Sequence, residues 1–499
     1  MREADTRTGT GQGRDVLVIG GGIAGLAAAH RLLDGDEPVN VTVLEASHRL
    51  GGKLLAGEIA GARVDLGAES MLARRPEAVG LAKAVGLTDR LQPPSTATAS
   101  IWTRGALRPM PKGHVMGVPG TADALAGVLS DEGLARIERD ADLPPTETGD
   151  DVAVGEYVAA RLGREVVDRL VEPLLGGVYA GDAYRISMRS AVPQLFEEAA
   201  RHRSLTEAVR AIQARAAANQ QTGPVFTGIE GGIGTLPAAV AESVRAKGGE
   251  ILLGARASTL GALGTARAAT DDAQWRVGIA DGRTFFADQV IIALPAPAAA
   301  SLLRTASPKA SQELRSIEYA SMALITLAYR TDDARLPEGS GFLVPPVDGH
   351  TIKAATFASH KWGWIAAENP GLRVVRTSVG RHGDERDLGR DDQDLVGIAR
   401  HDLREATGLT AAPVASHVTR WQDGLPQYPV GHTARVARVR EHLGQLPGIA
   451  VCGAAYDGVG IPACIASAHA AVDELRGDTS TREDLKANPV QSLHGGAGE

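Results

Sequence analysis

Cysteine is nearly absent from this chain. Only Cys452 and Cys464 occur among its 499 residues, too few for a disulfide framework or a cysteine-rich metal site. This usage is typical of a reducing compartment, so we predict a cytoplasmic protein. The sequence contains no HExxH or CxxC pattern, and we predict no metal site.

Excess positive charge and long apolar runs are also missing. Lys and Arg number 52 against 60 Asp and Glu, a formal charge of −8, which argues against a nucleic-acid partner. No apolar run approaches the roughly 20 residues that cross a bilayer, so we predict no stable membrane insertion. The polar first residues lack the apolar core of a signal peptide.

Aromatic residues make up only 4% of the chain, whereas apolar residues reach 43%. That apolar content is sufficient for sizeable cores. The length exceeds one ordinary domain, so we expect two or three packed units.

A glycine-rich turn follows the first apolar run. Residues 15–19 (DVLVI) predict a buried parallel strand. Gly20, Gly22 and Gly25 then form G-x-G-x-x-G, and an Ala-rich helix follows. Such glycines allow a tight turn, close backbone approach to a pyrophosphate and close helix–strand packing, while the helix N-terminus favours phosphate. The next strand, VTVLE, ends in Glu45, placed to accept hydrogen bonds from a ribose.

NAD and FAD both use this unit, and two further segments favour FAD. ASHRLGGK follows Glu45, and EIAGARVDLGAES adds a strand and a turn through residues 67–70. Near the other end, IAVCGAAYDGVGIPACI predicts a strand over 449–452 and a helix opened by 458–461. A flavin with its ribityl chain would span both ends, and a second helix N-terminus could stabilise negative charge on the reduced ring. Because neither cysteine lies in an attachment context, we predict noncovalent FAD.

The middle of the chain changes character. Residues 86–220 have a mostly helical pattern, whereas MALITLAYR and LRVVRTSVGR alternate like antiparallel strands. EPLLGGVYAGD (172–182) carries Pro and Gly, which destabilise helix interiors. Its composition is compatible with a surface loop and with a backbone bent to fit something flat and bulky.

The predicted fold class is α/β: a discontinuous Rossmann-type FAD-binding domain, an α+β substrate-binding domain and an inserted helical domain. In chain order we predict a disordered tail (1–14), the first segment of the FAD-binding domain (15–85), the helical, membrane-domain-like insertion (86–224), the second FAD-binding segment (225–300), the substrate-binding domain (301–415), the third FAD-binding segment (416–475) and a second disordered tail (476–499).

Several stretches resemble the FAD-dependent porphyrinogen oxidases. They include EPLLGGVYAGD with its flanking helices, TGIEGGIGTLP, TIKAATFASHKW, RWQDGLPQYPVGH and DGVGIPACI, and the likeness covers about residues 14–475. The terminal motifs are shared with amine oxidases and phytoene desaturases. EPLLGGVYAGD and RWQDGLPQYPVGH are more particular to porphyrinogen oxidases. The resemblance implies that residues 172–182 form a loop of the helical domain near the entrance to a macrocycle pocket.

The resemblance implies oxidation of a porphyrinogen by FAD and molecular oxygen in haem biosynthesis, with hydride transfer to flavin N5 and release of hydrogen peroxide. No side chain is predicted as acid or base. The Gram-positive, actinobacterial branch is most similar, so the predicted substrate is coproporphyrinogen III, and the downstream coproporphyrin ferrochelatase is a suggested partner. Alternatives are a protoporphyrinogen IX oxidase, another flavin oxidase or desaturase of the amine oxidase superfamily, and a flavin-binding scaffold without catalysis, against which the intact cofactor segments argue.

The candidate residues follow from these motifs and the resemblance. For FAD they are Gly20, Gly21, Gly22, Ile23, Ala24, Gly25, Glu45, Ala46, Arg49, Gly52, Lys53, Gly67, Ala68, Glu69, Ser70, Ala257, Trp421, Gly453, Val459, Gly460 and Ile461. For the substrate they are Arg75 and Lys112, as cations for propionates, and Tyr179, as a pocket wall. Arg74, Arg108, Lys361 and Trp362 are weaker candidates, and Cys464 is expected to be buried and inert.

Overall fold

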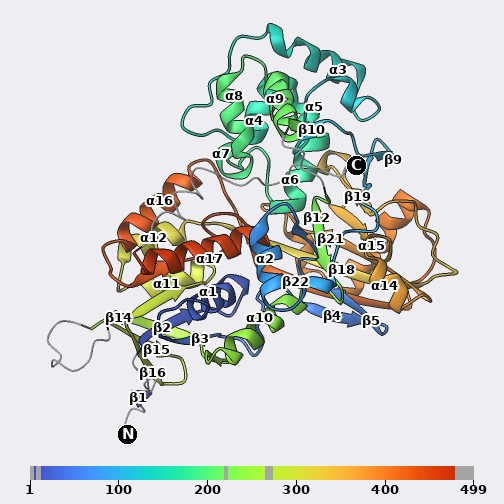
Figure 1. The fold of residues 1–499 in the computed structure, drawn as a ribbon. Coiled ribbons are helices and arrows are strands. Elements are labelled where there is room, and N and C mark those ends of the chain that lie inside the picture. The colour runs from blue at the N-terminus through green and yellow to red at the C-terminus, as the bar shows by residue number, and fades with distance from the viewer. Residues whose placement is uncertain (1–4, 7–12, 219–222, 264–273, 478–499) are drawn as a thin grey trace.

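The computed structural model describes residues 5–6, 13–218, 223–263 and 274–477 (Figure 1). A five-stranded sheet forms the centre of one half of the molecule, in the order β13-β3-β2-β17-β23. Every neighbouring pair in it is parallel, so the strand predicted over residues 15–19 is confirmed. The strands are β2 (Arg14–Ile19), β3 (Val39–Leu44), β13 (Glu250–Leu252), β17 (Gln289–Ile292) and β23 (Ile449–Val451).

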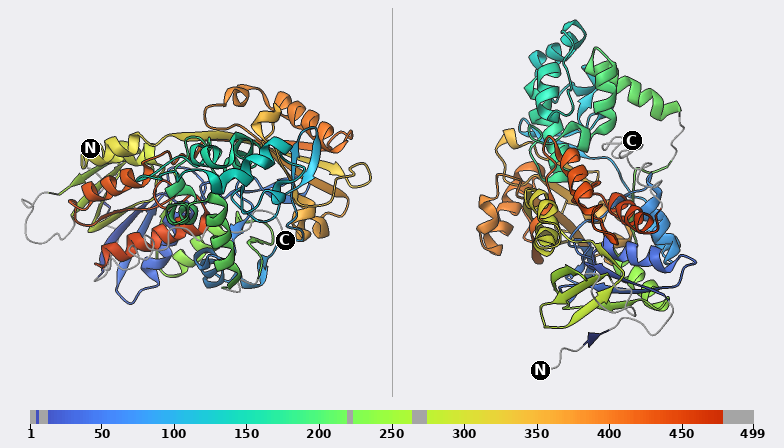
Figure 2. Two further views of the ribbon diagram at one scale, coloured as in Figure 1. Left: turned by 90° about the horizontal axis from the view of Figure 1, so that it is seen from above. Right: turned by 90° about the vertical axis from the view of Figure 1, so that its left-hand side faces the viewer.

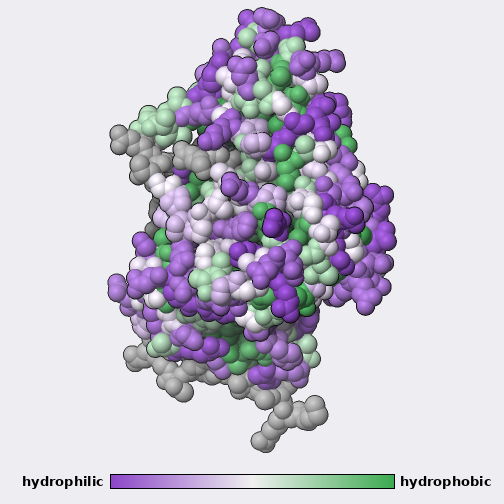
Figure 3. All heavy atoms as spheres, turned by 90° about the vertical axis from the view of Figure 1, so that its right-hand side faces the viewer, coloured by the Kyte–Doolittle hydropathy of each residue, from purple (hydrophilic) through white to green (hydrophobic). Residues whose placement is uncertain are grey.

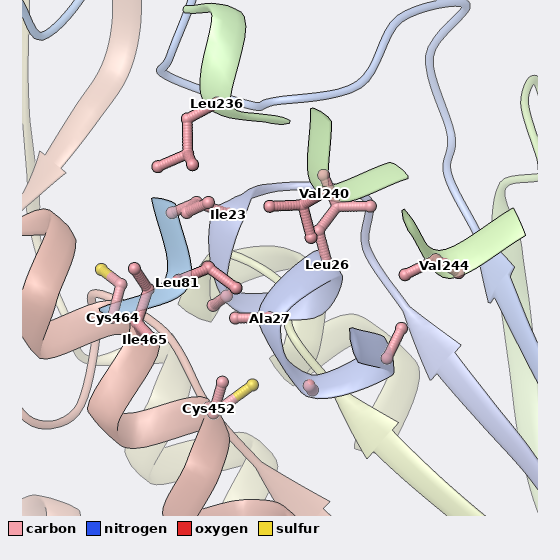
Figure 4. Close-up of a cluster of buried hydrophobic side chains, with 14 of the residues drawn as sticks. Ile23, Leu26, Ala27, Leu81, Leu236, Val240, Val244, Cys452, Cys464 and Ile465 are labelled. Atoms are coloured by element: carbon pink, nitrogen blue, oxygen red, sulfur yellow. The ribbon is translucent and has the colours of Figure 1, made fainter. Parts of the chain in front are cut away.

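Both faces of this sheet are buried, which explains its nearly continuous apolar strands. Val16 and Val18 enter one core, and Leu17 and Ile19 enter the other. Four helices cover the first face: α1 (Ile23–Leu33), α2 (Pro76–Ala84), α10 (Thr235–Ala246) and α17 (Ile461–Leu475). Figure 4 shows side chains of α1 lying between those of α10 and α17.

The second face is covered by a small sheet and three helices. They are β14 (Ala257–Ala262), β15 (Trp275–Ile279), β16 (Thr284–Ala287), α11 (Ala296–Leu303), α12 (Pro308–Arg315) and α16 (His432–Leu443). Since full burial of a large apolar side chain contributes roughly 1.5–3 kcal/mol, the two cores fix the carboxyl ends of the parallel strands.

A seven-stranded sheet forms the other half, in the order β22-β18-β21-β20-β19-β8-β9. It is antiparallel except where β19 runs parallel to β8. Its strands are β8 (Ser100–Thr103), β9 (Ala106–Pro109), β18 (Tyr319–Arg330), β19 (Gly341–Leu343), β20 (Ala354–Phe357), β21 (Leu372–Val379) and β22 (Ala415–Pro426). α15 (Asp392–Thr407) packs on one face.

Two predicted boundaries do not coincide with this sheet. β8 and β9 lie inside residues 86–224, assigned to the helical insertion, and β22 continues past residue 415 to Pro426. β8 pairs with β19 through Ser100 and Phe342, and a partner so distant leaves no mark on the local sequence pattern. We therefore propose that the substrate-binding domain includes both segments.

The helical region stands above the junction of the two halves (Figure 2). Its helices pack around one apolar core, to which Leu343 and Val459 of the two halves also contribute. They are α3 (Asp131–Glu138), α4 (Val154–Leu162), α5 (Arg164–Val166), the π-helix η4 (Val167–Val171), α6 (Glu172–Tyr179), α7 (Met188–Ala191), α8 (Pro193–Arg201) and α9 (Leu205–Ala218).

The loop predicted for residues 172–182 is wrong over most of its length. α6 is helical from Glu172 to Tyr179, and the chain turns only at Ala180, in the left-handed conformation (φ 48°). Pro173 is tolerated because it lies in the first turn of α6, two residues after the π-helix, whose wider hydrogen-bonding pattern already interrupts the α-helical pattern. Gly177 sits where α6 approaches the sheet: a Cβ there would lie 3.8 Å from Leu343 Cδ2.

The surface is mostly hydrophilic on the face shown in Figure 3, with scattered apolar patches. Within residues 13–218, 223–263 and 274–477, no helix is both long and apolar enough to span a bilayer.

Candidate functional site

Three glycines at the carboxyl end of β2 have different surroundings. A Cβ on Gly25 would lie 1.9 Å from the Gly20 carbonyl oxygen, and one on Gly20 (φ +115°) would lie 2.4 Å from the Ala293 carbonyl oxygen. Gly20 and Gly25 are therefore required for packing. Among the described residues, nothing lies within 4 Å of a Cβ built on Gly22. Gly22 thus presents open backbone directly before α1, as close approach of a pyrophosphate requires.

Glu45 follows β3 and faces this turn. Its carboxylate accepts hydrogen bonds from the amides of Gly21 at 2.7 Å and Ser47 at 2.8 Å. A carboxylate has acceptor capacity for further donors, so a ribose can still bind the fixed side chain. The Ala255 amide donates to the Glu45 carbonyl at 2.8 Å, which brings Ala257, at the start of β14, to the same edge.

A second loop crosses the glycine turn. The Gly51 amide donates to the Gly21 carbonyl at 2.9 Å. A Cβ built on Gly52 would lie 3.4 Å from the Cα of Gly22. Burial lowers the pKa of Lys53 in this loop. A partly desolvated ammonium in the loop that crosses the glycine turn suits an anionic ligand.

The turn through residues 67–70 is held by the seven-stranded sheet. Glu69 forms ion pairs with Lys361 at 2.7 Å and Arg376 at 2.5 Å, and Arg376 also donates to the Gly67 carbonyl at 2.7 Å. Although burial acts to raise the pKa of Glu69, the two cations outweigh it and lower that pKa to about 2. Trp421 Nε1 donates to the Leu66 carbonyl at 3.0 Å.

Sequence reasoning missed this use of Arg376 and named Lys361 only as a weak substrate candidate. The alternating apolar pattern of β21 gives no sign that Arg376 pairs with Glu69, which is 307 residues away. The carboxylate of Glu69 is engaged by protein cations, so any cofactor contact there would come from its backbone. The guanidinium of Arg49 lies 5.9 Å from the ring centroid of Trp421, whose indole bonds the Leu66 carbonyl.

The C-terminal segment supplies the second helix start. α17 begins at Ile461, and Gly460 is its N-cap. A Cβ on Gly453 would approach Ala24 at 3.9 Å, so the turn after β23 lies beside the start of α1. At their other ends α1 and α17 are joined by an ion pair between Arg31 and Asp473 at 2.7 Å. The two N-termini thus face one open turn, and these residues fit the dinucleotide portion of FAD.

The predicted substrate residues lie on separate elements. Arg75 is buried at the start of α2 and forms an ion pair with Glu77. Lys112 is exposed in the loop between β9 and β10 (His114–Val115). Tyr179 is buried at the end of α6, and its ring lies 5.7 Å from that of Tyr428. No hydrogen bond or ion pair of the described chain links the three.

Cys464 is buried near the start of α17. Its Sγ lies 3.7 Å from the Gly458 carbonyl oxygen, and burial raises the pKa of its thiol to about 12. The thiol therefore stays protonated at neutral pH, as an inert residue would.

Three features together define a dinucleotide-binding flavoprotein. They are a parallel sheet covered on both faces, a glycine turn with an acid on the next strand, and a second helix start at the far end of the chain. The chain belongs to the flavin-containing amine oxidoreductase family, whose model matches residues 23–476. The predicted α/β fold and the predicted FAD are confirmed by this membership.

Comparison with individual proteins shows which members of this family the chain is similar to. The chain is 37% identical over 465 residues to a coproporphyrinogen III oxidase of Mycobacterium tuberculosis (strain H37Rv), covering 93% of this chain and 97% of that protein. It is 33% identical to a coproporphyrinogen III oxidase of Bacillus subtilis (strain 168), covering 92% and 97%. A crystal structure of a provisional protoporphyrinogen oxidase from Exiguobacterium sp. 255-15 superposes with a TM-score of 0.81 at 32% identity, covering 94% and 99%. The predicted resemblance to porphyrinogen oxidases is thereby confirmed.

Proposed function

We propose that this chain oxidises coproporphyrinogen III to coproporphyrin III with FAD and molecular oxygen, releasing hydrogen peroxide, as a step of haem biosynthesis. The observation that carries the proposal is the likeness, along nearly the whole chain, to proteins named coproporphyrinogen III oxidase. Oxidation of protoporphyrinogen IX is the second candidate, which the likeness to the Exiguobacterium structure favours.

Bound FAD supplies the acceptor for hydrogen from the macrocycle and passes the electrons to oxygen. The protein's own residues bind and orient the two molecules. Gly22 leaves room for the pyrophosphate, Lys53 offers a cation to it, and Glu45 is fixed to receive a ribose. The ion pairs of Glu69 hold the 67–70 turn against the seven-stranded sheet.

Within this proposal the macrocycle binds beside α6, where that helix meets the seven-stranded sheet. Gly177 on α6 faces Leu343 of β19, and Leu343 packs against the helical core. Apolar walls suit the faces of a tetrapyrrole, and cations suit its propionates. Within this proposal the protein works in the cytoplasm and passes its product to a coproporphyrin ferrochelatase.

A steady-state comparison of the two porphyrinogens tests the substrate. The purified holoprotein is expected to have a higher kcat/KM for coproporphyrinogen III than for protoporphyrinogen IX. The opposite ranking would contradict the proposal in favour of the second candidate. Anaerobic addition of coproporphyrinogen should bleach the flavin absorbance, whereas an amine substrate should not. Bleaching by an amine alone would instead indicate an amine oxidase.

The attachment of FAD is tested separately. Cys452 and Cys464 are both buried, and we propose that FAD is held without a covalent bond. Acid denaturation followed by centrifugation should leave the yellow colour in the supernatant. Colour that remains with the precipitated protein would show covalent attachment.

A further inference from the structure

The two stretches most particular to porphyrinogen oxidases meet in space. Gln427 Nε2 donates to the Tyr179 carbonyl at 2.8 Å, and the rings of Tyr179 and Tyr428 lie 5.7 Å apart. The amide of Ser187 donates to the Tyr428 carbonyl at 2.8 Å. The segment after β22 is therefore bound to the end of α6 and to the chain that follows it.

The end of α6 is held in a conformation that its sequence does not favour. Ala180 has a φ of 48°, in the left-handed region that non-glycine residues rarely adopt. Its carbonyl accepts a hydrogen bond from the His382 amide at 2.7 Å, and Gln427 holds the preceding carbonyl. Such a conformation persists only where surrounding contacts fix it, so the position of Tyr179 is set from outside the helix.

Tyr428 also contacts the turn that leads into α17. Its hydroxyl donates to the Ala454 carbonyl in this turn. This turn contains Gly453 and Val459, both predicted to bind FAD. The Tyr428 ring is 2% exposed and stacks on His432 at 4.1 Å between ring centroids. A ring enclosed in this way cannot change its position without moving its neighbours.

We infer that Tyr428 is a positioning residue that sets the end of α6 relative to the FAD-contacting turn, residues 453–460. Its ring contacts Tyr179 on one side, and its hydroxyl fixes the turn on the other. The inference rests on the proposed function, in which α6 forms a wall of the porphyrinogen pocket. Tyr428 would thereby set how the macrocycle lies against the flavin without reacting with either.

The variant Tyr428→Phe tests this role, because it keeps the ring and removes the hydroxyl. Tyr157→Phe is the matched control: Tyr157 is buried in the helical core, and its hydroxyl donates to the Thr146 carbonyl at 3.3 Å. Tyr428→Phe is expected to release FAD from the holoprotein roughly fivefold faster and to shift the flavin absorption bands. We expect kcat for coproporphyrinogen to fall about tenfold while KM changes by less than about twofold. Tyr157→Phe should leave all four measurements at the wild-type values.

Equal FAD release and an equal flavin spectrum in Tyr428→Phe and Tyr157→Phe would overturn the inference. Both readouts are measured without substrate. If the wild type does not oxidise coproporphyrinogen, the proposed function fails while these readouts still test Tyr428. Should Tyr428→Phe not fold, Gln427→Leu replaces it, since it removes the hydrogen bond to the Tyr179 carbonyl and spares the turn. In that variant the flavin should be reduced more slowly by coproporphyrinogen, while FAD is released at the wild-type rate. Flavin reduction at the wild-type rate would again overturn the inference.

Discussion

The parallel-sheet half and the seven-stranded half build their regions of the site in different ways. In the first, each feature lies within a few residues of a strand end: Gly20 to Gly25 after β2, Glu45 after β3, and Gly453 after β23. In the second, the features are pairings between distant segments, such as β8 with β19 and Arg376 with Glu69. A cofactor site can thus be encoded in short motifs, whereas a substrate site depends on how the whole chain packs.

If this contrast holds, the largest effects on stability should come from glycines of the parallel-sheet half at positions where no side chain fits. A side chain in Gly25→Ala would meet the Gly20 carbonyl oxygen at 1.9 Å, so α1 must move away from β2. We expect a loss of about 3 kcal/mol in the free energy of unfolding, with little holoprotein recovered. Denaturant unfolding measures the loss. Gly80→Ala, in α2 with open space around it, is the control and should be neutral or slightly stabilising. Equal stability of the two variants would contradict the packing role.

The substitution Gly22→Val tests FAD binding separately from the stability of the fold. Its side chain has open space and an ordinary backbone conformation (φ −73°), so we expect the free energy of unfolding of the apoprotein to change by less than about 1 kcal/mol. Most of the FAD should be lost, because the valine occupies the place of the pyrophosphate. The ratio of flavin to protein absorbance measures the loss, and full flavin content would place the phosphates elsewhere.

Glu69→Gln tests the distant pairing of the second half. The folded pKa of about 2 lies below the ordinary 4.5, so Glu69 stabilises the fold above pH 4.5, and this contribution disappears as the pH falls through the folded pKa. Its size is about 3 kcal/mol. The variant should lose stability of that order at pH 7 and show a weaker decline of stability between pH 4.5 and about 2. A variant as stable as the wild type at pH 7 would show that the pairing contributes nothing.

The smallest effects are expected from the predicted propionate cations. Lys112 is exposed, so Lys112→Ala should lower the ratio of kcat/KM for coproporphyrinogen over protoporphyrinogen by less than about threefold. Arg75→Ala should lower it more, because Arg75 is buried. Steady-state kinetics with both porphyrinogens check this ranking. An unchanged ratio in both variants would place the propionate contacts on other residues.

The sequence predicted the first half well and the second only in outline. The turn at Gly20 to Gly25 is recognisable because its chemistry and its packing both depend on residues next to each other. The helix α6 was missed because Pro173 and the glycines argue against a helix unless the preceding π-helix is known. The links from Gln427 and Arg376 could not be predicted, because a side-chain amide or guanidinium carries no mark of a partner hundreds of residues away.

The packing of α17 against α1 has a consequence for folding of the chain during its synthesis on the ribosome. Arg31 and its partner Asp473 are 442 residues apart, so a ribosome adding about 5–20 residues per second completes α17 roughly 20 to 90 seconds after α1. Throughout that time the nascent parallel sheet lacks β23, and the side of α1 that packs on α17 stays uncovered. Closure of this core therefore waits for the synthesis of α17, and the emerging chain needs protection from aggregation until then.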